Sequence, residues 1–264
     1  MNENYTPLND EEAEFLKNYQ PGKYAPMAVT VDNVIFTIHH NELSVLLIKR
    51  GGHPYKDHWA LPGGFKNPNE SLQEAALREL KEETDLDPEH VHLEQLGSYG
   101  DPGRDPRMDV VSVAFVALGP NPGDPTGGDD ASDARFFAVR DILSPADEED
   151  RVLLAFDHLQ IIRDGWERAA AKLEYTPLAT AFLDEQFTLA DLRRVYEKVW
   201  LIPEGQIHAS GFRRKVLSTP GFIEPVGTKG ESQFPNGRSA DLYRRGDVKL
   251  LHPAILRKDA SLVA

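Results

Sequence analysis

Three glutamates near residue 80 have the types and spacing that a divalent metal site requires. Glu79, Glu82 and Glu83 stand at positions i, i+3 and i+4, which share one face of a helix. Carboxylates so close together repel one another and resist loss of water, so the arrangement favours a cation between them. Mg²⁺ and Mn²⁺ take several oxygen ligands and can bind such a cluster. The alternative interpretation is an ordinary solvated acidic face.

The helix that carries these glutamates is defined by the residues before it. Ser71 and Glu74 have the spacing of a capping box, in which each side chain bonds a free backbone N–H of the first turn. We therefore expect the helix to begin near Leu72. Residues a heptad apart lie within about 20° of each other around a helix, so Glu79 falls beneath Leu72. The inward face thus changes from apolar to acidic halfway along, which favours the metal-binding interpretation.

The spacing of this segment closely resembles the signature box of the Nudix hydrolases. Gly64, Glu70 and the run from Arg78 to Leu86 stand at the separations of that signature, whose many fixed positions are rarely matched by chance. The family expects glycine where this chain has Asp85. Aspartate tolerates the left-handed backbone that glycine provides, so we expect the loop to form. The resemblance implies an α/β fold in which helices flank a mixed sheet.

The resemblance also implies roles for residues of the box. The metal ligands for Mg²⁺ or Mn²⁺ would be Glu79, Glu82, Glu83 and Glu70, although Glu70 could instead brace the loop. Arg78 would orient the carboxylates, because it can reach Glu74 and Glu82 one turn away on either side. The metal would neutralise a pyrophosphate and activate water. The general base stays open, because any glutamate near the metal could serve.

Cationic residues outside the helix are candidates for contact with the substrate. Arginine forks suit phosphate oxygens, and a turn-rich loop from Gly100 to Arg107 carries two arginines. Similar Nudix chains place a substrate-contacting cation at the position of Arg50, and a proline sixteen residues past the box resembles the marker of the ADP-ribose pyrophosphatases. The predicted substrate contacts are Arg50, Gly64, Pro102, Arg104 and Arg107. Solvated arginines in an ordinary strand end and turn are the alternative.

Hydrophobic patterning predicts the elements that position these residues. We expect an N-terminal leader over 1–26 with a short helix near Glu11–Asn18, followed by a Nudix domain over 27–175. The expected strands are Val29–Ile38 and Ser44–Ile48, which form a hairpin, and Val91–Tyr99, Val110–Leu118 and Ala134–Val139. Helical spacing from Leu153 to Leu173 places Phe156, Leu159, Ile162, Trp166 and Ala169 on one face.

Residues 176–264 have the pattern of a smaller winged helix-turn-helix domain. Thr188 and Asp191 form a second capping box, and a basic helix is expected over Ile207–Leu217. Strands at Phe222–Val226 and Ala240–Arg244 would form a wing. A helix can enter the major groove while wing cations neutralise phosphates. The predicted DNA contacts are Arg213, Arg214, Lys215, Lys229, Arg238 and Arg244. The alternative is a dimerisation domain with solvated cations.

Charge and composition agree with two tasks in one chain. Residues 1–187 hold 16 Lys and Arg against 35 Asp and Glu, whereas residues 188–264 hold 13 against 8, which makes the C-terminal part the candidate for nucleic acid. There is no cysteine, which excludes disulfides, a thiolate nucleophile and zinc–thiolate sites. The start lacks a signal-peptide pattern and no run of apolar residues could span a membrane, so we expect a cytoplasmic protein.

The order of the two parts resembles the Nudix-related transcriptional regulators of NAD metabolism. The resemblance rests on the box, on Phe212–Val216 and on Leu242–Arg244. It implies a homodimer that binds ADP-ribose or a related NAD-derived nucleotide, and double-stranded operator DNA. The retained glutamates imply hydrolysis of ADP-ribose to AMP and ribose 5-phosphate. The alternative is a plain Nudix hydrolase of nucleoside diphosphate-linked substrates whose C-terminal domain serves dimerisation.

Overall fold

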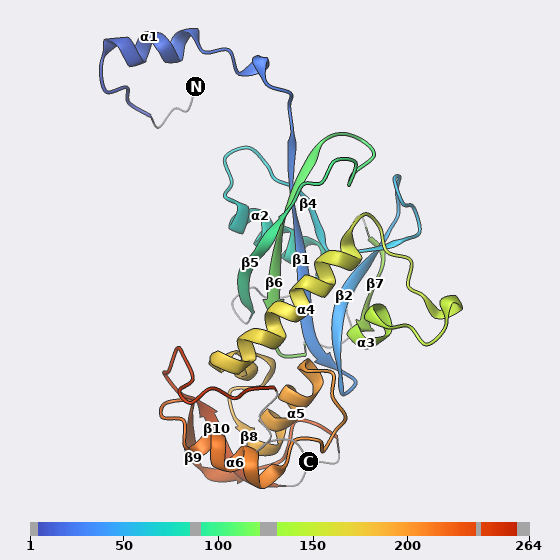
Figure 1. Ribbon diagram of the computed structural model, residues 1–264, viewed down its shortest axis with the longest axis vertical. Coiled ribbons are helices and arrows are strands. Elements are labelled where there is room, and N and C mark those ends of the chain that lie inside the picture. Colours follow the sequence, from blue (N-terminus) through green and yellow to red (C-terminus); the bar gives the residue numbers. More distant parts are fainter. Residues whose placement is uncertain (1–4, 85–90, 122–130, 236–238, 258–264) are drawn as a thin grey trace.

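The computed structural model describes residues 5–84, 91–121, 131–235 and 239–257, except for the side chains of residues 83, 84, 131 and 132. The molecule is elongated, with an N-terminal arm at one end, a sheet in the middle and a small helical part at the other end (Figure 1). Within the described ranges, no helix has both the length and the apolarity needed to cross a membrane.

A mixed seven-stranded sheet forms the middle of the molecule. Its strands run in the order β3-β2-β1-β6-β5, while β4 pairs with β1 and β7 pairs with β2. β1 and β6 are parallel, and the other pairs are antiparallel. The strands are β1 (Ala28–His39), β2 (Glu42–Arg50), β3 (Trp59–Ala60), β4 (Gly63–Phe65), β5 (His92–Tyr99), β6 (Val110–Leu118) and β7 (Ala131–Ala138). The mixed sheet and the predicted hairpin are confirmed.

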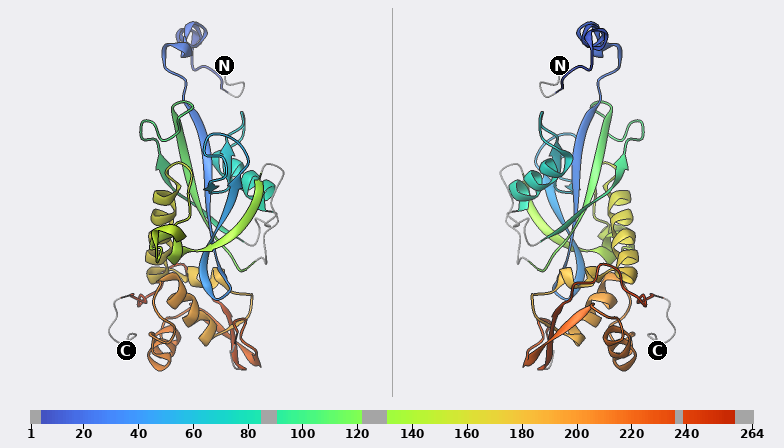
Figure 2. Two further views of the ribbon diagram at one scale, coloured as in Figure 1. Left: turned by 90° about the vertical axis from the view of Figure 1, so that its right-hand side faces the viewer. Right: turned by 90° about the vertical axis from the view of Figure 1, so that its left-hand side faces the viewer.

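Two helices cover opposite faces of this sheet (Figure 2). α2 (Leu72–Thr84) packs Ala75 and Ala76 onto Val31 of β1. α4 (His158–Tyr175) packs onto the other face, where its Gly165 comes so close that an added Cβ would lie 3.1 Å from Val34. β1 is therefore buried on both sides, which explains its nearly continuous run of apolar and β-branched residues.

The C-terminal part is a helix-turn-helix with a wing, as predicted. Thr188 and Asp191 form the expected capping box at the start of α5. Tyr196 packs edge-to-face against both Trp200 and Phe212, which joins the two helices of the motif. The elements are β8 (Phe187–Thr188), α5 (Leu189–Val199), α6 (Ala209–Leu217), β9 (Ile223–Gly230) and β10 (Ala240–Arg245), and the three strands form one sheet in the order β8-β10-β9.

Polar and apolar contacts join the winged helix to α4. The indole N–H of Trp166 donates to the Val199 carbonyl at 2.8 Å, and that of Trp200 donates to the Ala170 carbonyl at 3.1 Å. One hydrophobic cluster runs without interruption from β1 through α4 into α5 and α6. The ammonium of Lys198 also lies 3.5 Å from a Glu42 carboxylate oxygen at the tip of the β1–β2 hairpin. The sheet and the winged helix thus share a core.

The predicted helix from Leu153 to Leu173 begins five residues too early. The structure begins α4 at His158, whereas residues 153–155 join the edge of the sheet and residues 156–157 form a turn. The Trp59 N–H bonds the Leu153 carbonyl at 2.9 Å, and the Ala155 N–H bonds the Trp59 carbonyl at 2.8 Å. These backbone bonds hold the segment extended in spite of its helical spacing. Phe156 then turns with a positive φ of 53°, away from the predicted helix face.

Smaller differences lie at the ends of the sheet and in the connections. β7 begins at Ala131, three residues before the predicted start, and both α3 (Val139–Leu143) and β8 were not predicted. The leader contains α1 (Asp10–Asn18), close to the predicted helix, and Asn9 caps it by accepting from the Glu12 N–H. In both views of Figure 2, α1 stands apart from the sheet at the end of the molecule.

Candidate functional site

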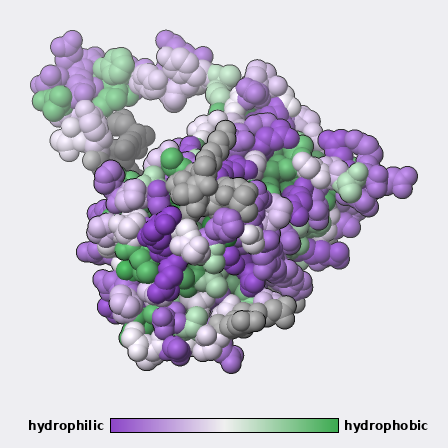
Figure 3. Space-filling view, turned by 60° about the horizontal axis from the view of Figure 1, so that its bottom comes forward, coloured by the Kyte–Doolittle hydropathy of each residue, from purple (hydrophilic) through white to green (hydrophobic). Residues whose placement is uncertain are grey.

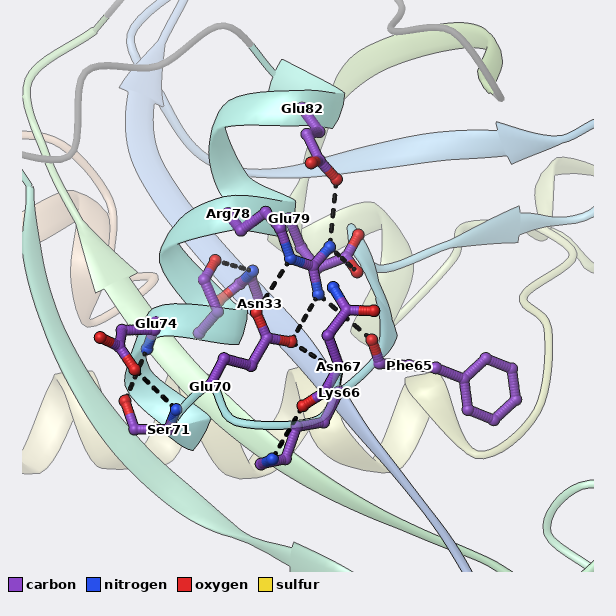
Figure 4. A network of polar contacts seen from close by, with 11 residues as sticks. Asn33, Phe65, Lys66, Asn67, Glu70, Ser71, Glu74, Arg78, Glu79 and Glu82 are labelled. Atoms are coloured by element: carbon purple, nitrogen blue, oxygen red, sulfur yellow. Dashed lines mark hydrogen bonds and ion pairs between the residues drawn. The ribbon is translucent and has the colours of Figure 1, made fainter. Parts of the chain in front are cut away.

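A single guanidinium gathers three of the predicted metal ligands (Figure 4). Arg78 donates to both oxygens of Glu70 at 3.1 and 2.9 Å, to Glu79 at 2.7 Å and to Glu82 at 3.1 Å. A further bond, at 3.2 Å to the Phe65 carbonyl, ties the same group to β4. The side chain of Arg78 therefore fixes the positions of carboxylates from both the loop and the helix. Bidentate pairing of this kind is geometrically specific.

The predicted reach of Arg78 to Glu74 is wrong. Glu74 is held by the capping box, in which it accepts from the Ser71 N–H at 2.6 Å while its own N–H donates to the Ser71 hydroxyl at 3.2 Å. The Glu74 carboxylate therefore bonds the backbone at the helix start and not Arg78. Glu70, which precedes the helix, fills the place beside Arg78 instead. The position of Glu70 as a brace of the loop agrees with the second of its two predicted roles.

The carboxylates of this cluster differ in their tendency to ionise. Hydrogen bonds from Arg78 and from the Asn67 N–H lower the pKa of Glu70 to about 2. Burial raises the pKa of Glu79 above its ordinary value, although Arg78 opposes this effect. Glu82 is exposed. Glu79 is thus the carboxylate that most needs a further positive partner.

Hard oxygen donors of this kind fit Mg²⁺ or Mn²⁺. Within the described residues, no three acidic or histidine side chains are grouped as a metal site. Arg78 donates to one oxygen of Glu79 and to one oxygen of Glu82. The side chain of Glu83, the third predicted ligand, lies outside the described residues. Asp85 also lies outside them.

Metal affinity is expected to fall as the pH is lowered from neutral to mildly acidic. A proton competes with the metal for Glu79, and the raised pKa of this group makes that competition begin at a higher pH than for an exposed glutamate. Titration with Mn²⁺ at several pH values measures the effect. In Glu79→Gln the residual affinity should depend less on pH. An unchanged pH dependence in this variant would show that Glu79 is not the titrating ligand.

Gly64 is required because the Glu79 carboxylate lies against its backbone. A Cβ added at Gly64 would lie 2.4 Å from Glu79 Oε1, a distance that real contacts do not reach. Gly64→Ala should therefore displace Glu79 and lower Mn²⁺ affinity about 10- to 100-fold, the usual cost of disturbing the support of a metal ligand. Gly52→Ala is the matched control, since an added Cβ there meets nothing within 4 Å. Equal affinities in the two variants would contradict this account.

A cavity of about 430 Å³ opens beside Gly64, and its lining includes none of the glutamates of α2 whose side chains the structure describes. Four of the five predicted substrate contacts line it, namely Arg50, Gly64, Arg104 and Arg107. Pro102 does not belong to this cavity and lines a smaller hollow with Met27 and Met108 instead. The structure therefore brings the Arg50 guanidinium to one site with those of Arg104 and Arg107, which come from a distant loop.

The guanidinium groups of the loop are held in place by carboxylates. The Arg104 side chain is only 5% exposed and donates to both oxygens of Asp157, at 2.9 and 2.7 Å, while an Asp32 oxygen lies 3.8 Å away. Arg107 is more exposed and pairs with Asp105 at 2.7 Å. Both groups are fully charged cations in fixed orientations. Such preorganised donors suit a phosphate or pyrophosphate.

Two aromatic rings, those of Phe65 and Phe156, also line the cavity. The Arg50 guanidinium lies 5.0 Å from the centre of the Phe156 ring, and the Arg107 guanidinium lies 5.3 Å from that of Phe65. Asp32 and His158 also line the cavity. Sequence reasoning missed Asp32, Phe156 and His158. A lone aspartate within an apolar strand was an available signal for Asp32, whereas nothing marked His158 or separated Phe156 from the predicted helix face.

The predicted DNA contacts lie on α6 and on the wing. Arg213 and Arg214 are exposed, opposite the buried Phe212 and Val216, and Lys215 is partly exposed. The remaining predicted contacts are Lys229, which is exposed on β9, Arg244, which pairs with Glu224 at 2.8 Å on the wing, and Arg238, which lies outside the described residues. Hydrophilic residues cover most of this end of the molecule (Figure 3). The helix therefore presents two cations to solvent.

Two separate parts of this chain match known protein families. The NUDIX domain model matches residues 27–156, and the model of the NrtR DNA-binding winged helix domain matches residues 179–245. The ADPR responsive transcriptional repressor NtrR of Acinetobacter baylyi is 32% identical over 243 residues, which cover 88% of each chain. The ADP-ribose pyrophosphatase of Methanocaldococcus jannaschii is 42% identical over 149 residues, which cover 56% of this chain and 78% of that protein.

Solved structures of similar proteins have the same architecture. A MutT/nudix family protein from Enterococcus faecalis superposes with a TM-score of 0.74 at 31% identity, covering 91% of this chain and 94% of the other. NrtR of Shewanella oneidensis, complexed with a 27mer DNA, gives 0.66 at 33% identity, covering 84% and 99%. The NUDIX domain of the same NrtR, complexed with ADP ribose, gives 0.52 at 38% identity, covering 60% and 97%. This chain therefore belongs to the family of Nudix-domain regulators that carry an NrtR winged helix domain.

Proposed function

We propose that this protein is a DNA-binding transcriptional regulator of NAD metabolism whose Nudix domain binds ADP-ribose or a related NAD-derived nucleotide. The observation that carries the proposal is that one chain joins a cavity lined by three guanidinium groups to a helix-turn-helix with exposed arginines. The similarity to NtrR along most of both chains supports it. The ADP ribose bound by the Shewanella oneidensis NUDIX domain supports the choice of ligand.

The cavity has the size and chemistry for such a ligand. Its volume of about 430 Å³ is within the usual range for small-molecule sites. Arg104 and Arg107 would bind the pyrophosphate, and Phe156 offers a ring in the cavity lining for a base or sugar. The glutamates of the Nudix box lie directly beyond Gly64. A pyrophosphate in the cavity would therefore lie next to the proposed metal ligands.

The winged helix would bind double-stranded operator DNA. α6 is the second helix of the motif, and such helices lie in the major groove. Its exposed Arg213, Arg214 and Lys215 would contact bases and phosphates, while Lys229, Arg238 and Arg244 of the wing would neutralise further phosphates. We propose that the protein does so as a cytoplasmic homodimer. We also propose domain limits of 27–175 and 176–264, which the positions of the two family matches support.

α4 offers a physical route between ligand and DNA. At its start, Asp157 holds Arg104 in the cavity. Toward its end, the Trp166 indole and the Ala170 carbonyl bind the winged helix. A phosphate that competes with Asp157 for Arg104 would change the contacts of the helix that carries the DNA-binding part. Ligand binding could then shift the equilibrium between arrangements of the two domains.

We further propose that the Nudix domain hydrolyses ADP-ribose to AMP and ribose 5-phosphate. Mg²⁺ or Mn²⁺, held by Glu79, Glu82 and Glu83 with Glu70 as a further ligand or brace, would neutralise the pyrophosphate and activate water. Arg78 would keep the carboxylates in position through the bonds described above. Retention of these residues and the similarity to an ADP-ribose pyrophosphatase support this activity.

A gel-shift titration tests the regulatory function. The probes are promoter fragments of genes for NAD metabolism and a shuffled fragment of equal length, each at salt concentrations from about 50 to about 200 mM. A shift specific to one promoter fragment is expected. Absence of any specific shift, even at low salt, would favour the plain hydrolase with a C-terminal dimerisation domain. Release of AMP from ADP-ribose in the presence of Mg²⁺ or Mn²⁺ tests the enzymatic activity separately.

A further inference from the structure

Two buried polar side chains in the cavity take no part in the Nudix box. Asp32 of β1 is 7% exposed, and His158, the first residue of α4, is 3% exposed. Both line the cavity. The oxygen Oδ2 of Asp32 accepts from the Ser112 hydroxyl, whereas Oδ1 lies 3.7 Å from Nε2 of His158. This distance is too long for a direct hydrogen bond.

The protonation of His158 follows from its other nitrogen. Nδ1 accepts from the Leu61 N–H at 2.9 Å, so this nitrogen carries no proton. Burial lowers the pKa of the ring, which keeps it neutral at pH 7. The single ring proton is therefore on Nε2. A hydrogen-bond donor on His158 and an acceptor on Asp32 thus face each other across a gap that one further atom could bridge.

A hydroxyl group has the chemistry to bridge this gap. It can donate to Asp32 Oδ1 and accept from His158 Nε2–H at the same time. A phosphate fits poorly, because the carboxylate of Asp32 would repel it. The Phe156 ring, whose centre lies 5.3 Å from that of the His158 ring, offers an apolar face for a sugar beside this gap. The neighbouring Arg104, 3.8 Å from Asp32, would bind a phosphate beside the hydroxyl. A sugar attached to a phosphate presents this pair of groups.

We propose that Asp32 and His158 form a subsite that binds either the 2′-hydroxyl of the adenosine ribose or a hydroxyl of the terminal ribose of the nucleotide. The inference rests on the proposed function, since it assumes that a sugar nucleotide enters this cavity. It adds a source of specificity that the glutamates and arginines do not provide. A ligand without that hydroxyl would leave a buried donor and acceptor unpaired, which binding sites reject.

Removing the two partners one at a time tests the subsite. His158→Asn keeps an oxygen able to accept from the Leu61 N–H but removes the donor that faces Asp32, and Asp32→Asn removes the charged acceptor. Tyr99→Phe is the matched control, because its hydroxyl bonds Asp164 of α4 outside the cavity, at 2.9 Å. Calorimetry with EDTA present would measure the binding of ADP-ribose, of 2′-deoxy-ADP-ribose and of ADP, which lacks the terminal ribose. Melting temperatures verify that each variant is folded.

The two cavity variants should bind ADP-ribose about tenfold more weakly than the natural protein, while Tyr99→Phe binds it equally well. The affinity for either 2′-deoxy-ADP-ribose or ADP should fall less than about twofold in the same two variants, because that ligand lacks the hydroxyl that Asp32 and His158 bind. Equal losses for all three ligands, or no loss in either folded variant, would overturn the subsite. If the natural protein binds no ADP-ribose at all, the proposed function fails, and this inference fails with it.

Discussion

Replacing Arg213 and Arg214 together by alanine is expected to weaken specific DNA binding at least about 30-fold, because each arginine that contacts a base contributes about 1–3 kcal/mol. Both side chains are exposed on α6, whereas Phe212 and Val216 anchor the helix in the core. The substitution should therefore leave the fold intact. Fluorescence anisotropy with a labelled promoter fragment measures the affinity, and its salt dependence should become weaker with the loss of phosphate contacts.

The matched control removes two positive charges from the other domain. Arg151 and Arg163 are exposed on the Nudix side, and their joint replacement by alanine should leave DNA affinity within about twofold. ADP-ribose binding should be unchanged in both double variants. If the control weakened DNA binding as much as the α6 variant, the loss of affinity would come from the change in net charge and not from lost contacts of α6 with DNA. Loss of ADP-ribose binding in the α6 variant would point to misfolding.

Glu82→Gln is expected to lower the rate of AMP release from ADP-ribose at least about 100-fold. Disturbing the partners of a metal ligand commonly costs 10- to 100-fold, and loss of the ligand itself should reach the upper end of that range or exceed it. Glu82 is exposed at the end of the Arg78 network, so the change should not disturb the core. DNA binding is expected to persist. The assay is single-turnover AMP release with excess Mg²⁺ or Mn²⁺.

Glu74→Gln is the control on the same helix. It removes the same charge, but glutamine can replace glutamate in a capping box, and Arg78 does not depend on this side chain. Its rate should stay within about threefold of the natural protein. Rapid hydrolysis by Glu82→Gln would refute the metal assignment. No hydrolysis by the natural protein, with ADP-ribose binding retained, would make the Nudix domain a sensor only.

The features that could be predicted from the sequence are those that depend on residues within one short segment. The capping boxes at Ser71 and Thr188 depend on residues three positions apart, and both helices begin where these patterns predicted. The spacing of the Nudix box likewise lies within a single segment. Strand β6 was recognisable because it is apolar apart from Ser112 and is buried on both faces. Local patterns therefore predicted most of the helices and strands.

The floor of the cavity could not be predicted in the same way. Asp32, Arg104 and His158 come from a strand, a loop and a helix start that are far apart in the sequence, and only the sheet brings them together. The predicted start of the helix at Leu153 was wrong, because backbone bonds to Trp59 hold residues 153–155 at the edge of the sheet. The predicted contact of Arg78 with Glu74 was also wrong. Helical spacing favoured Glu74, but its carboxylate accepts from the Ser71 N–H in the capping box.

The most direct test of the central claim is a titration of ADP-ribose into the complex of this protein with its promoter DNA, followed by fluorescence anisotropy. EDTA prevents hydrolysis during the measurement, and ADP-ribose added to DNA alone serves as the blank. We predict a specific complex that ADP-ribose dissociates in a saturable manner, because ligand and DNA act on domains joined by α4. A specific complex that ignores saturating ADP-ribose, or no specific complex at all, would contradict the account.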